Sequence, residues 1–242
     1  MRPGLFHVKA SGRISVSTIA SRFGLGADAS DRLTALADLI AGDPAAPTTV
    51  TDPADILRDH VADSLVGLEL ACVRGAVTVA DLGAGAGFPG LPLGVALPQS
   101  TVALVESNAR KCAFIAHAAE VCRIANVEVV NARAEEWAAG MRTCDLVTAR
   151  ALAPLAVVAE YAAPLLRIGG TLVAWRGRRD PEDEASGARA ADELGLEPAP
   201  PVRVEPYPGA QHRHLHPMVK IGETPPRFPR RPGMARKRPL GA

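Results

Sequence analysis

The chain of 242 residues carries 27 basic and 26 acidic side chains, a net charge of +1, and 48% of its residues are hydrophobic. This length and apolar content are enough for one substantial core with a small appendage. No stretch approaches the roughly 18 to 20 uninterrupted apolar residues of a membrane span, and the opening "MRPGLFHVKASGRISVS" lacks the apolar centre of a secretory signal. A membrane or secreted protein is therefore not expected, and a cytoplasmic location is.

Two helices are predicted before the first strand. Residues 29–42, "ASDRLTALADLIAG", have amphipathic spacing, with Ser30 or Asp31 as the cap and Gly42 at the end. A loop with three prolines follows, and residues 53–71 predict a second helix with Pro53 in its first turn.

Strand-like and helix-length segments alternate from there on. This alternation predicts βαβ units and a doubly wound, mostly parallel sheet. The last two strands are joined by a short Pro/Gly loop and are expected to form a hairpin at one sheet edge. The strands are expected at 76–83, 101–107, 127–133, 144–150, 169–177, 201–208 and 214–222, with an acidic helix near 181–194. The resulting division is an N-terminal helical segment (1–60), a sheet domain (61–222) and a tail (223–242).

The tail differs from the body in charge. From Pro217 onward there are seven basic residues and one acidic residue, a net of +6, which leaves 20 basic and 25 acidic residues, a net of −5, in the body. "TPPRFPRRPGMARKRPLGA" is Pro-rich and without periodicity, so we expect an irregular or disordered arm. Such an arm either has no binding role or contacts nucleic-acid phosphates.

Patterns for metal binding are weak. His212, His214 and His216 alternate as on a strand and could face one way, but no carboxylate or cysteine lies nearby in the sequence. The cysteines form no CxxC pair and lie in strand or helix segments, so buried free thiols are expected at Cys72, Cys112, Cys122 and Cys144. We therefore expect no metal site.

A glycine-rich turn follows the first strand, in "ADLGAGAGFPGLPLGVALP". Gly85, Gly87 and Gly90 match GxGxxG, and Glu106 ends the next strand, as in a dinucleotide site. Asp81 before the turn would repel a pyrophosphate, however, and Pro89 removes a backbone N–H that could hold one. S-adenosylmethionine carries a sulfonium and an ammonium but no phosphate, so an acidic residue favours it, and Glu106 is placed to accept both ribose hydroxyls. A turn without any ligand is the plainer alternative, although closely spaced glycines cost folding entropy.

Several further segments carry a family resemblance. "LRDHVADSL", "VADLGAGAGFPGLPLGVALP", "LVESNARKCAFI", "NARAEEW", "CDLVTARALAPL" and "LLRIGGTLVAWRG" occur in this order. They resemble the bacterial small-subunit rRNA guanine-N7 methyltransferases, also called glucose-inhibited division protein B. The resemblance implies a Rossmann-like class I methyltransferase fold, S-adenosylmethionine as methyl donor, and one guanine in the 530 loop of 16S rRNA as substrate. It also implies 16S rRNA, the 30S subunit or its precursor as partner, and we expect a monomer.

The glycine turn and the resemblance together suggest site residues. For the cofactor these are Asp81, Gly83, Gly85, Gly87, Phe88, Glu106, Ala134, Glu135 and Arg150. Basic side chains that follow strands or open the next helix are expected on the same rim, where they could bind RNA phosphates. The RNA-binding candidates are His60, which with Asp63 and Ser64 matches a family signature, and Arg110, Lys111, Arg133, Arg150 and Arg176. His60 could instead be a packing histidine, and Lys111 and Arg133 could be solvated charges.

No catalytic base is expected. The N7 lone pair of guanine carries no proton, so the transfer depends on positioning. The chain has no NPPY or DPPY run, and the corresponding strand end reads "TARALAP". Two departures from the family pattern are Ala46 in place of an Asn and Arg176 in place of a Lys, and Arg and Lys are not interchangeable in a tight site.

Other functions stay open at this point. A dinucleotide-dependent oxidoreductase is disfavoured by Asp81 and the prolines. A non-catalytic ribosome-assembly protein is supported only by the basic tail. Within the methyltransferases, another RNA guanine or a small molecule is the competing substrate.

Overall fold

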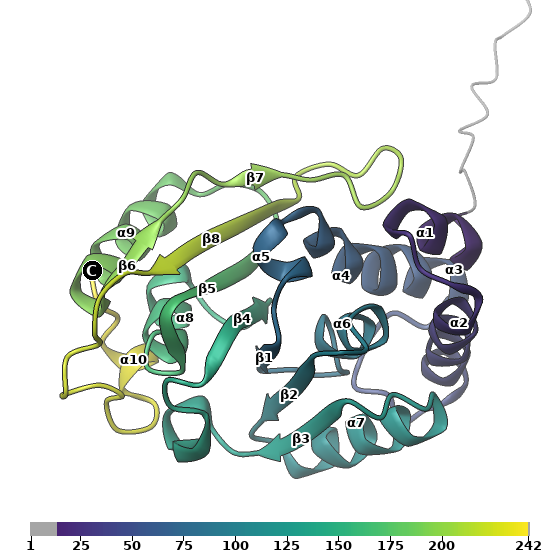
Figure 1. The fold of residues 1–242 in the computed structure, drawn as a ribbon, viewed down its shortest axis with the longest axis horizontal. Helices are drawn as coiled ribbons and strands as arrows, with labels where there is room; N and C mark the ends of the chain where they lie inside the picture. Colours follow the sequence, from purple (N-terminus) through teal and green to yellow (C-terminus); the bar gives the residue numbers. More distant parts are fainter. Residues whose placement is uncertain (1–13, 242) are drawn as a thin grey trace, which may run out of the picture.

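A sheet of eight strands forms the centre of the protein, in a computed structural model that describes residues 14–241 (Figure 1). Residues 1–17, in which no secretory signal is expected, lie mostly outside the described residues. The strand order is β3-β2-β1-β4-β5-β8-β6, with β7 pairing with β8. The parallel strands are β1 (Thr78–Leu82), β2 (Thr101–Glu106), β3 (Val127–Asn131), β4 (Cys144–Arg150) and β5 (Leu166–Arg176). The predicted mostly parallel sheet is confirmed.

The last two strands pair antiparallel, as expected for a hairpin, but the pair does not lie at the sheet edge in the expected way. β8 (His214–Lys220) pairs with β5 on one side and with β6 (Leu196–Pro198) on the other, so it is not an edge strand. β7 (Val202–Arg203) has only two residues and also pairs with β8. The short strand β6 was not predicted, because three residues carry too little periodicity to be recognised.

Helices cover both faces of the sheet, and the side chains of each strand alternate between them. Val79 belongs to the apolar cluster with α6 (Gly90–Ala96), α7 (Ala109–Val121) and the N-terminal helices, whereas Ala80 and Leu82 belong to the cluster with α8 (Leu155–Ala162) and α9 (Pro181–Leu194). α9 coincides with the predicted acidic helix. The described residues include no helix with the length and apolarity to cross a bilayer.

The N-terminal helices are α1 (Val16–Phe23) and α2 (Ala27–Gly42). α2 ends at Gly42 as predicted, but it begins after Gly26, so capping by Ser30 or Asp31 was wrong. The Ser30 hydroxyl instead donates to the Gly26 carbonyl inside the first turn, at 3.2 Å. α1 and α2 pack on the same apolar cluster as α6 and α7, which joins this segment to the sheet.

The second predicted helix is broken into pieces. α3 (Pro53–Ile56) starts with Pro53 in its first turn, as predicted, and Asp52 caps it. A π-helical turn η1 (Leu57–Ala62), then α4 (Asp63–Leu65), a 3-10 turn η2 (Val66–Glu69) and α5 (Ala71–Arg74) follow. π turns are rare and often lie at functional sites. This one carries His60 of the family signature, and Asp63 and Ser64 follow directly in α4.

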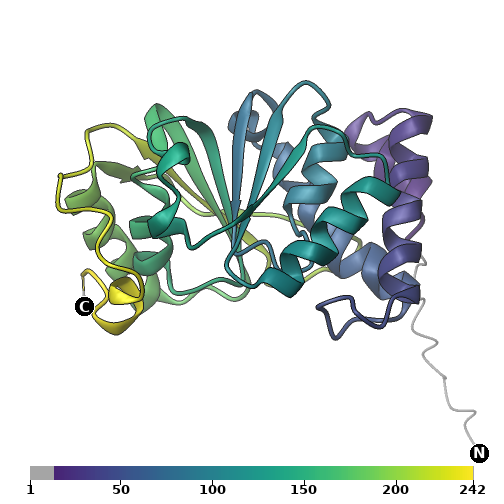
Figure 2. The same cartoon turned by 90° about the horizontal axis from the view of Figure 1, so that it is seen from below.

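The C-terminal tail is packed and mostly irregular, so the irregular alternative of the expected irregular or disordered arm holds. It forms the short helix α10 (Met234–Lys237), with Phe228 8% and Ala235 1% exposed against the cluster of α8 and α9. Arg230 pairs with Glu160 of α8, whose carboxylate is buried. The tail lies at the opposite end of the molecule from the N-terminal helices (Figure 2).

Candidate functional site

The glycine turn after β1 is folded tightly on itself. Gly83, Gly85 and Gly87 have φ values of +66°, +61° and +92°, a conformation that favours glycine. A Cβ on Gly83 would lie 2.5 Å from Cδ1 of Leu152, so this residue also permits close packing. The backbone N–H groups of the turn donate within the protein at Gly83, Ala84, Gly85, Gly87, Phe88 and Gly90. These amides are therefore occupied and do not form a phosphate cradle, which argues against a dinucleotide.

Asp81 lies beneath the turn and does not line a cavity. It alternates with Leu82 along β1 and is fully buried, where it accepts hydrogen bonds from the Gly90 N–H and the Thr148 hydroxyl, both at 2.9 Å. Burial raises the pKa of Asp81 to about 7, although these two hydrogen bonds oppose the rise. The structure thus gives this carboxylate the task of holding the turn against α6, and it offers no route for the expected direct contact with a ligand.

A cavity of about 530 Å³ opens on the α8 side of the strand ends. We call it the Glu106 cavity; its lining comprises Leu82, Gly83, Val105, Glu106, Ser107, Lys111, Ala132, Arg133, Ala134, Glu135, Ala151, Leu152, Tyr161 and Arg236. Glu106 is 7% exposed, and its two carboxylate oxygens accept hydrogen bonds from the N–H groups of Gly85 (3.2 Å) and Asn108 (2.8 Å). These bonds fix the carboxylate at the cavity wall with acceptor capacity left for a ligand.

Several of the expected cofactor residues meet in this cavity: Gly83, Glu106, Ala134 and Glu135, and the expected RNA-binding residues Lys111 and Arg133 lie there as well. Gly85 shapes the wall through its bond to Glu106. Gly87 does not line the cavity, and a Cβ on it would lie 2.3 Å from Cδ1 of Leu91.

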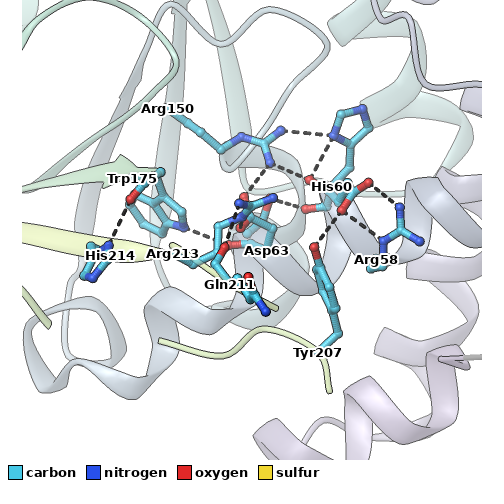
Figure 3. A network of polar contacts seen from close by, with 12 residues as sticks. Arg58, His60, Asp63, Arg150, Trp175, Tyr207, Gln211, Arg213 and His214 are labelled. Carbon is cyan, nitrogen blue, oxygen red and sulfur yellow. Dashed lines mark hydrogen bonds and ion pairs between the residues drawn. The ribbon is translucent and has the colours of Figure 1, made fainter. Parts of the chain in front are cut away.

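Arg150, at the end of β4, is held in a polar network shown in Figure 3. Its guanidinium donates to the Asp59 carbonyl and to the Asp63 carboxylate, each at 2.9 Å, and lies 3.3 Å from Nδ1 of His60. Asp63 also pairs with Arg213 at 3.3 Å, and its carbonyl accepts from the indole of Trp175 at 2.8 Å. The network rigidly joins the π turn to the strand ends.

His60 and Phe88 stack beside this network, with ring centroids 4.6 Å apart. The guanidinium carbon of Arg150 lies 5.4 Å from the centre of the Phe88 ring. Burial, assisted by the Arg150 charge, lowers the pKa of His60, so its imidazole is neutral at pH 7. Phe88 therefore packs under Arg150 and His60 and does not line the Glu106 cavity.

A second cavity, of about 520 Å³, lies beside the network. This Arg150 cavity is lined by Asp59, His60, Asp63, Arg150, Ala151, Trp175, Arg176, Gly177, Arg178, Val204, Arg213 and His214. Ala151, with φ of +53°, belongs to both linings, so the two cavities adjoin at the residue after β4.

The basic residues expected on one rim are divided between the cavities. Arg150 and Arg176 line the Arg150 cavity, where Arg176 is held by the Ala153 carbonyl at 2.8 Å and by an ion pair with Asp183. Arg110 is exposed in the first turn of α7 and lines neither.

Sequence reasoning missed Arg178, Arg213, Trp175 and Asp59 as cavity residues, and also Leu152, Tyr161 and Arg236. Arg213 is the clearest case, because it lies outside every strand and reaches Asp63, 150 positions away, only in the folded protein. Arg178 had a usable signal, since it follows the end of β5 closely and strand ends carry the site in such sheets.

The histidines and cysteines form no recognisable metal centre. Residues 14–241 contain no group of three or more His, Cys, Asp or Glu side chains placed to hold a metal ion. His214 Nδ1 lies 2.9 Å from the Gly177 carbonyl, and the Nε2 atom of the buried His216 has no hydrogen-bond partner. The four cysteines are free thiols; Cys112, Cys122 and Cys144 are buried, as predicted, and Cys72 is half-buried.

Comparison with known proteins gives one consistent family. A family model described as rRNA small subunit methyltransferase G matches residues 41–199. The chain is 38% identical over 245 residues to ribosomal RNA small subunit methyltransferase G of Rubrobacter xylanophilus, covering 97% of this chain and 94% of the relative. It is 41% identical over 199 residues to the protein of the same name from Chloroflexus aggregans, covering 80% and 82%.

Solved structures share the fold at low sequence identity. A ribosomal protein L11 methylase from Lactobacillus delbrueckii subsp. bulgaricus has a TM-score of 0.55 at 17% identity, over 74% of this chain and 84% of the other. Fibrillarin from Aeropyrum pernix, solved with natively bound S-adenosyl-L-methionine, has a TM-score of 0.53 at 19% identity, over 65% and 73%. These likenesses establish the Rossmann-like methyltransferase fold.

Proposed function

The chain belongs to the rRNA small subunit methyltransferase G family, and we propose that it methylates N7 of one guanine in the 530 loop of 16S rRNA. It is an S-adenosylmethionine-dependent methyltransferase. The observation that carries the proposal is the pair of adjoining cavities, which meet at Ala151 at the carboxyl ends of the strands. Ligands of doubly wound sheets bind at this edge, and a transfer between two substrates needs two pockets that open toward each other.

The Glu106 cavity fits the methyl donor. The N–H groups of its glycine turn donate to other groups of the protein, which suits a ligand without phosphate. Glu106 is available to accept hydrogen bonds from the ribose hydroxyls. Gly83, Ala134 and Glu135 would complete the wall. When bound there, S-adenosylmethionine supplies an electrophilic methyl group on a sulfonium. The residues of the cavity bind and orient the donor and need not move a proton.

The Arg150 cavity fits the guanine and its phosphates. Arg150, Arg176, Arg178 and Arg213 outnumber Asp59 and Asp63 in its lining, so it favours an anionic ligand. Guanine N7 carries no proton and loses none on methylation, so this cavity needs no general base. The cavity therefore contributes positioning, by holding the acceptor still against the donor.

Partner, assembly and domain boundaries extend the same proposal. The substrate is 16S rRNA, presented free, in the 30S subunit or in its precursor, and the enzyme acts as a cytoplasmic monomer. The sheet domain, residues 61–222, supplies most of both cavities, and Asp59, His60 and Arg236 complete them from the flanking segments. Light scattering on the purified protein, alone and with 30S subunits, measures its mass and so tests whether it is a monomer.

The decisive experiment supplies purified protein and tritiated S-adenosylmethionine with naked 16S rRNA or with 30S subunits. We expect label in one N7-methylguanosine of the 530 loop, mapped by mass spectrometry, and loss of that nucleoside after deletion of the gene. Label at another guanine or in a small molecule would show that the substrate is not the guanine of the 530 loop. An unchanged map after deletion, with no transfer in vitro, would leave a non-catalytic assembly factor.

A further inference from the structure

The C-terminal tail lies beside α8 (Figure 1), and its Arg236 lines the Glu106 cavity. It is anchored at three points. Arg230 pairs with Glu160, whose side chain is 2% exposed, with Nε 2.6 Å from Oε1. Phe228 packs into the cluster of α8 and α9, and the Gly241 carbonyl accepts from Nε of Arg189 at 2.8 Å. A removed or mobile tail would leave the buried Glu160 charge unpaired, so this packing is costly to undo.

Between these anchors the tail reaches the wall of the cavity. The Gly233 N–H donates to Oε1 of Glu135 at 3.0 Å, and Arg236 donates to the Leu152 carbonyl at 2.9 Å. Arg236 lines the cavity itself, next to Tyr161 and Leu152. The tail thus ties together the turn after β3 and the turn after β4, which lie on separate parts of the chain.

The tail's charges are directed inward to a large extent. Arg227 pairs with Glu193 at 2.8 Å, Arg230 with Glu160, and Arg236 with a backbone carbonyl. Lys220 likewise donates to the Leu194 carbonyl at 2.6 Å, so four of the seven cations counted from Pro217 onward hold protein groups. These contacts favour a role of the tail at the Glu106 cavity over a role in binding RNA.

We propose that the packed tail, residues 227–241, places Arg236 in the wall of the methyl-donor pocket, and that Arg236 is a positioning residue for the adenosyl end of the donor. The proposal rests on the assignment of the Glu106 cavity to the donor. It follows from where the tail's contacts lie. The Gly233 N–H holds Glu135, and Arg236 lies in the same lining as Glu106, the acceptor expected for the ribose hydroxyls of the adenosyl group. Among the described residues, no hydrogen bond joins residues 227–241 to the glycine turn.

The test measures binding by calorimetry, without RNA, for two probes. S-adenosylhomocysteine carries both ends of the donor, and 5′-methylthioadenosine lacks the amino-acid end. Arg236→Ala should weaken both probes by the same factor, about fivefold for one lost hydrogen-bonding group. Lys237→Ala is the matched control, since it removes a neighbouring exposed cation outside the cavity lining; it should leave both affinities unchanged.

A second variant ends at Pro226 and carries Glu160→Gln, so that no buried charge is left unpaired. With its fold checked by circular dichroism, it should lose at least tenfold in affinity for both probes. Unchanged affinity in both variants, or weakening of S-adenosylhomocysteine alone, would overturn the inference. Failure of the wild-type protein to bind S-adenosylhomocysteine would instead overturn the assignment of the cavity, so the two failures are distinguishable.

Discussion

The Glu106 cavity and the Arg150 cavity adjoin at Ala151 but are built in different ways. Most of the first is formed by the ends of consecutive parallel strands and the turns that follow them. The second collects residues of a π turn, of two strand ends and of the segment from 204 to 214. Its lining also holds four arginines against two aspartates. The difference indicates that the cavity proposed for the donor is built mostly from neighbouring strand ends, whereas the cavity proposed for the RNA is assembled from distant parts of the chain.

The sharpest way to break this comparison is Glu106→Ala. The variant removes the acceptor expected to bind two ribose hydroxyls, and hydrogen bonds to a charged group are worth about 1.5 to 3 kcal/mol each. We expect at least a 100-fold loss of S-adenosylhomocysteine affinity by calorimetry, with RNA affinity unchanged. Glu120→Ala, on the exposed surface of α7, is the control. A loss smaller than threefold would contradict the donor assignment.

Arg150→Ala tests the assignment of the Arg150 cavity to the RNA. The substitution removes the guanidinium that ties Asp59 and Asp63 to β4, while Asp63 keeps Arg213 as a partner. We expect kcat/KM for RNA at saturating donor to fall about 30-fold, within the range for hydrogen bonds to charged groups. S-adenosylhomocysteine affinity should stay within twofold. Equal losses in both measurements would show that Arg150 serves the donor as well.

Asp81→Asn tests the difference between two carboxylates on neighbouring strands: Glu106 lines a cavity, whereas Asp81 does not. The pKa of Asp81 is raised to about 7 from 3.8, so the folded state holds its proton more tightly than the unfolded state. The free energy of unfolding therefore falls as pH rises from about 4 to about 7, by up to about 1.4 kcal/mol per pH unit, or tenfold in the unfolding constant.

The asparagine cannot ionise, so urea denaturation should show a flatter pH dependence for this variant across that window. Donor affinity should change less than threefold, because the side chain does not line the cavity. Parallel stability curves for the two proteins would refute the assignment of the titration to Asp81.

The smallest effect is expected at Arg178. This residue lines the Arg150 cavity, whereas its neighbour Arg179 does not. Arg178→Ala should weaken RNA binding about threefold and lower the slope of log Kd against log salt by about 1, as for one lost phosphate contact. Arg179→Ala, which loses only an exposed pair with Glu184 at 2.8 Å, should change neither. Filter binding at several salt concentrations provides the slopes, and identical slopes would remove Arg178 from the RNA surface.

Local patterns predicted much of the fold and half of the site. The alternation of strands and helices predicted the parallel sheet, and Glu106 followed from its place at the end of a strand. Ala134 and Glu135 followed only from the family resemblance. Asp81 was misplaced because the sign of its charge was weighed without the period of the strand, which turns it away from Leu82 and from the cavity. The continuous helix over 53–71 failed because amphipathic spacing does not reveal a π turn.

The sequence by itself determined the fold class, the family and the place of the glycine turn, because glycine conformation and strand period act over a few neighbouring residues. Only the tertiary structure decided that Arg150 lies in an ion-pair network and that the basic tail borders the donor cavity. The reason is physical: both depend on pairs such as Arg213 with Asp63 and Arg230 with Glu160, whose partners lie 150 and 70 positions apart. Burial strengthens such pairs, and composition alone cannot show which charges the fold will bury.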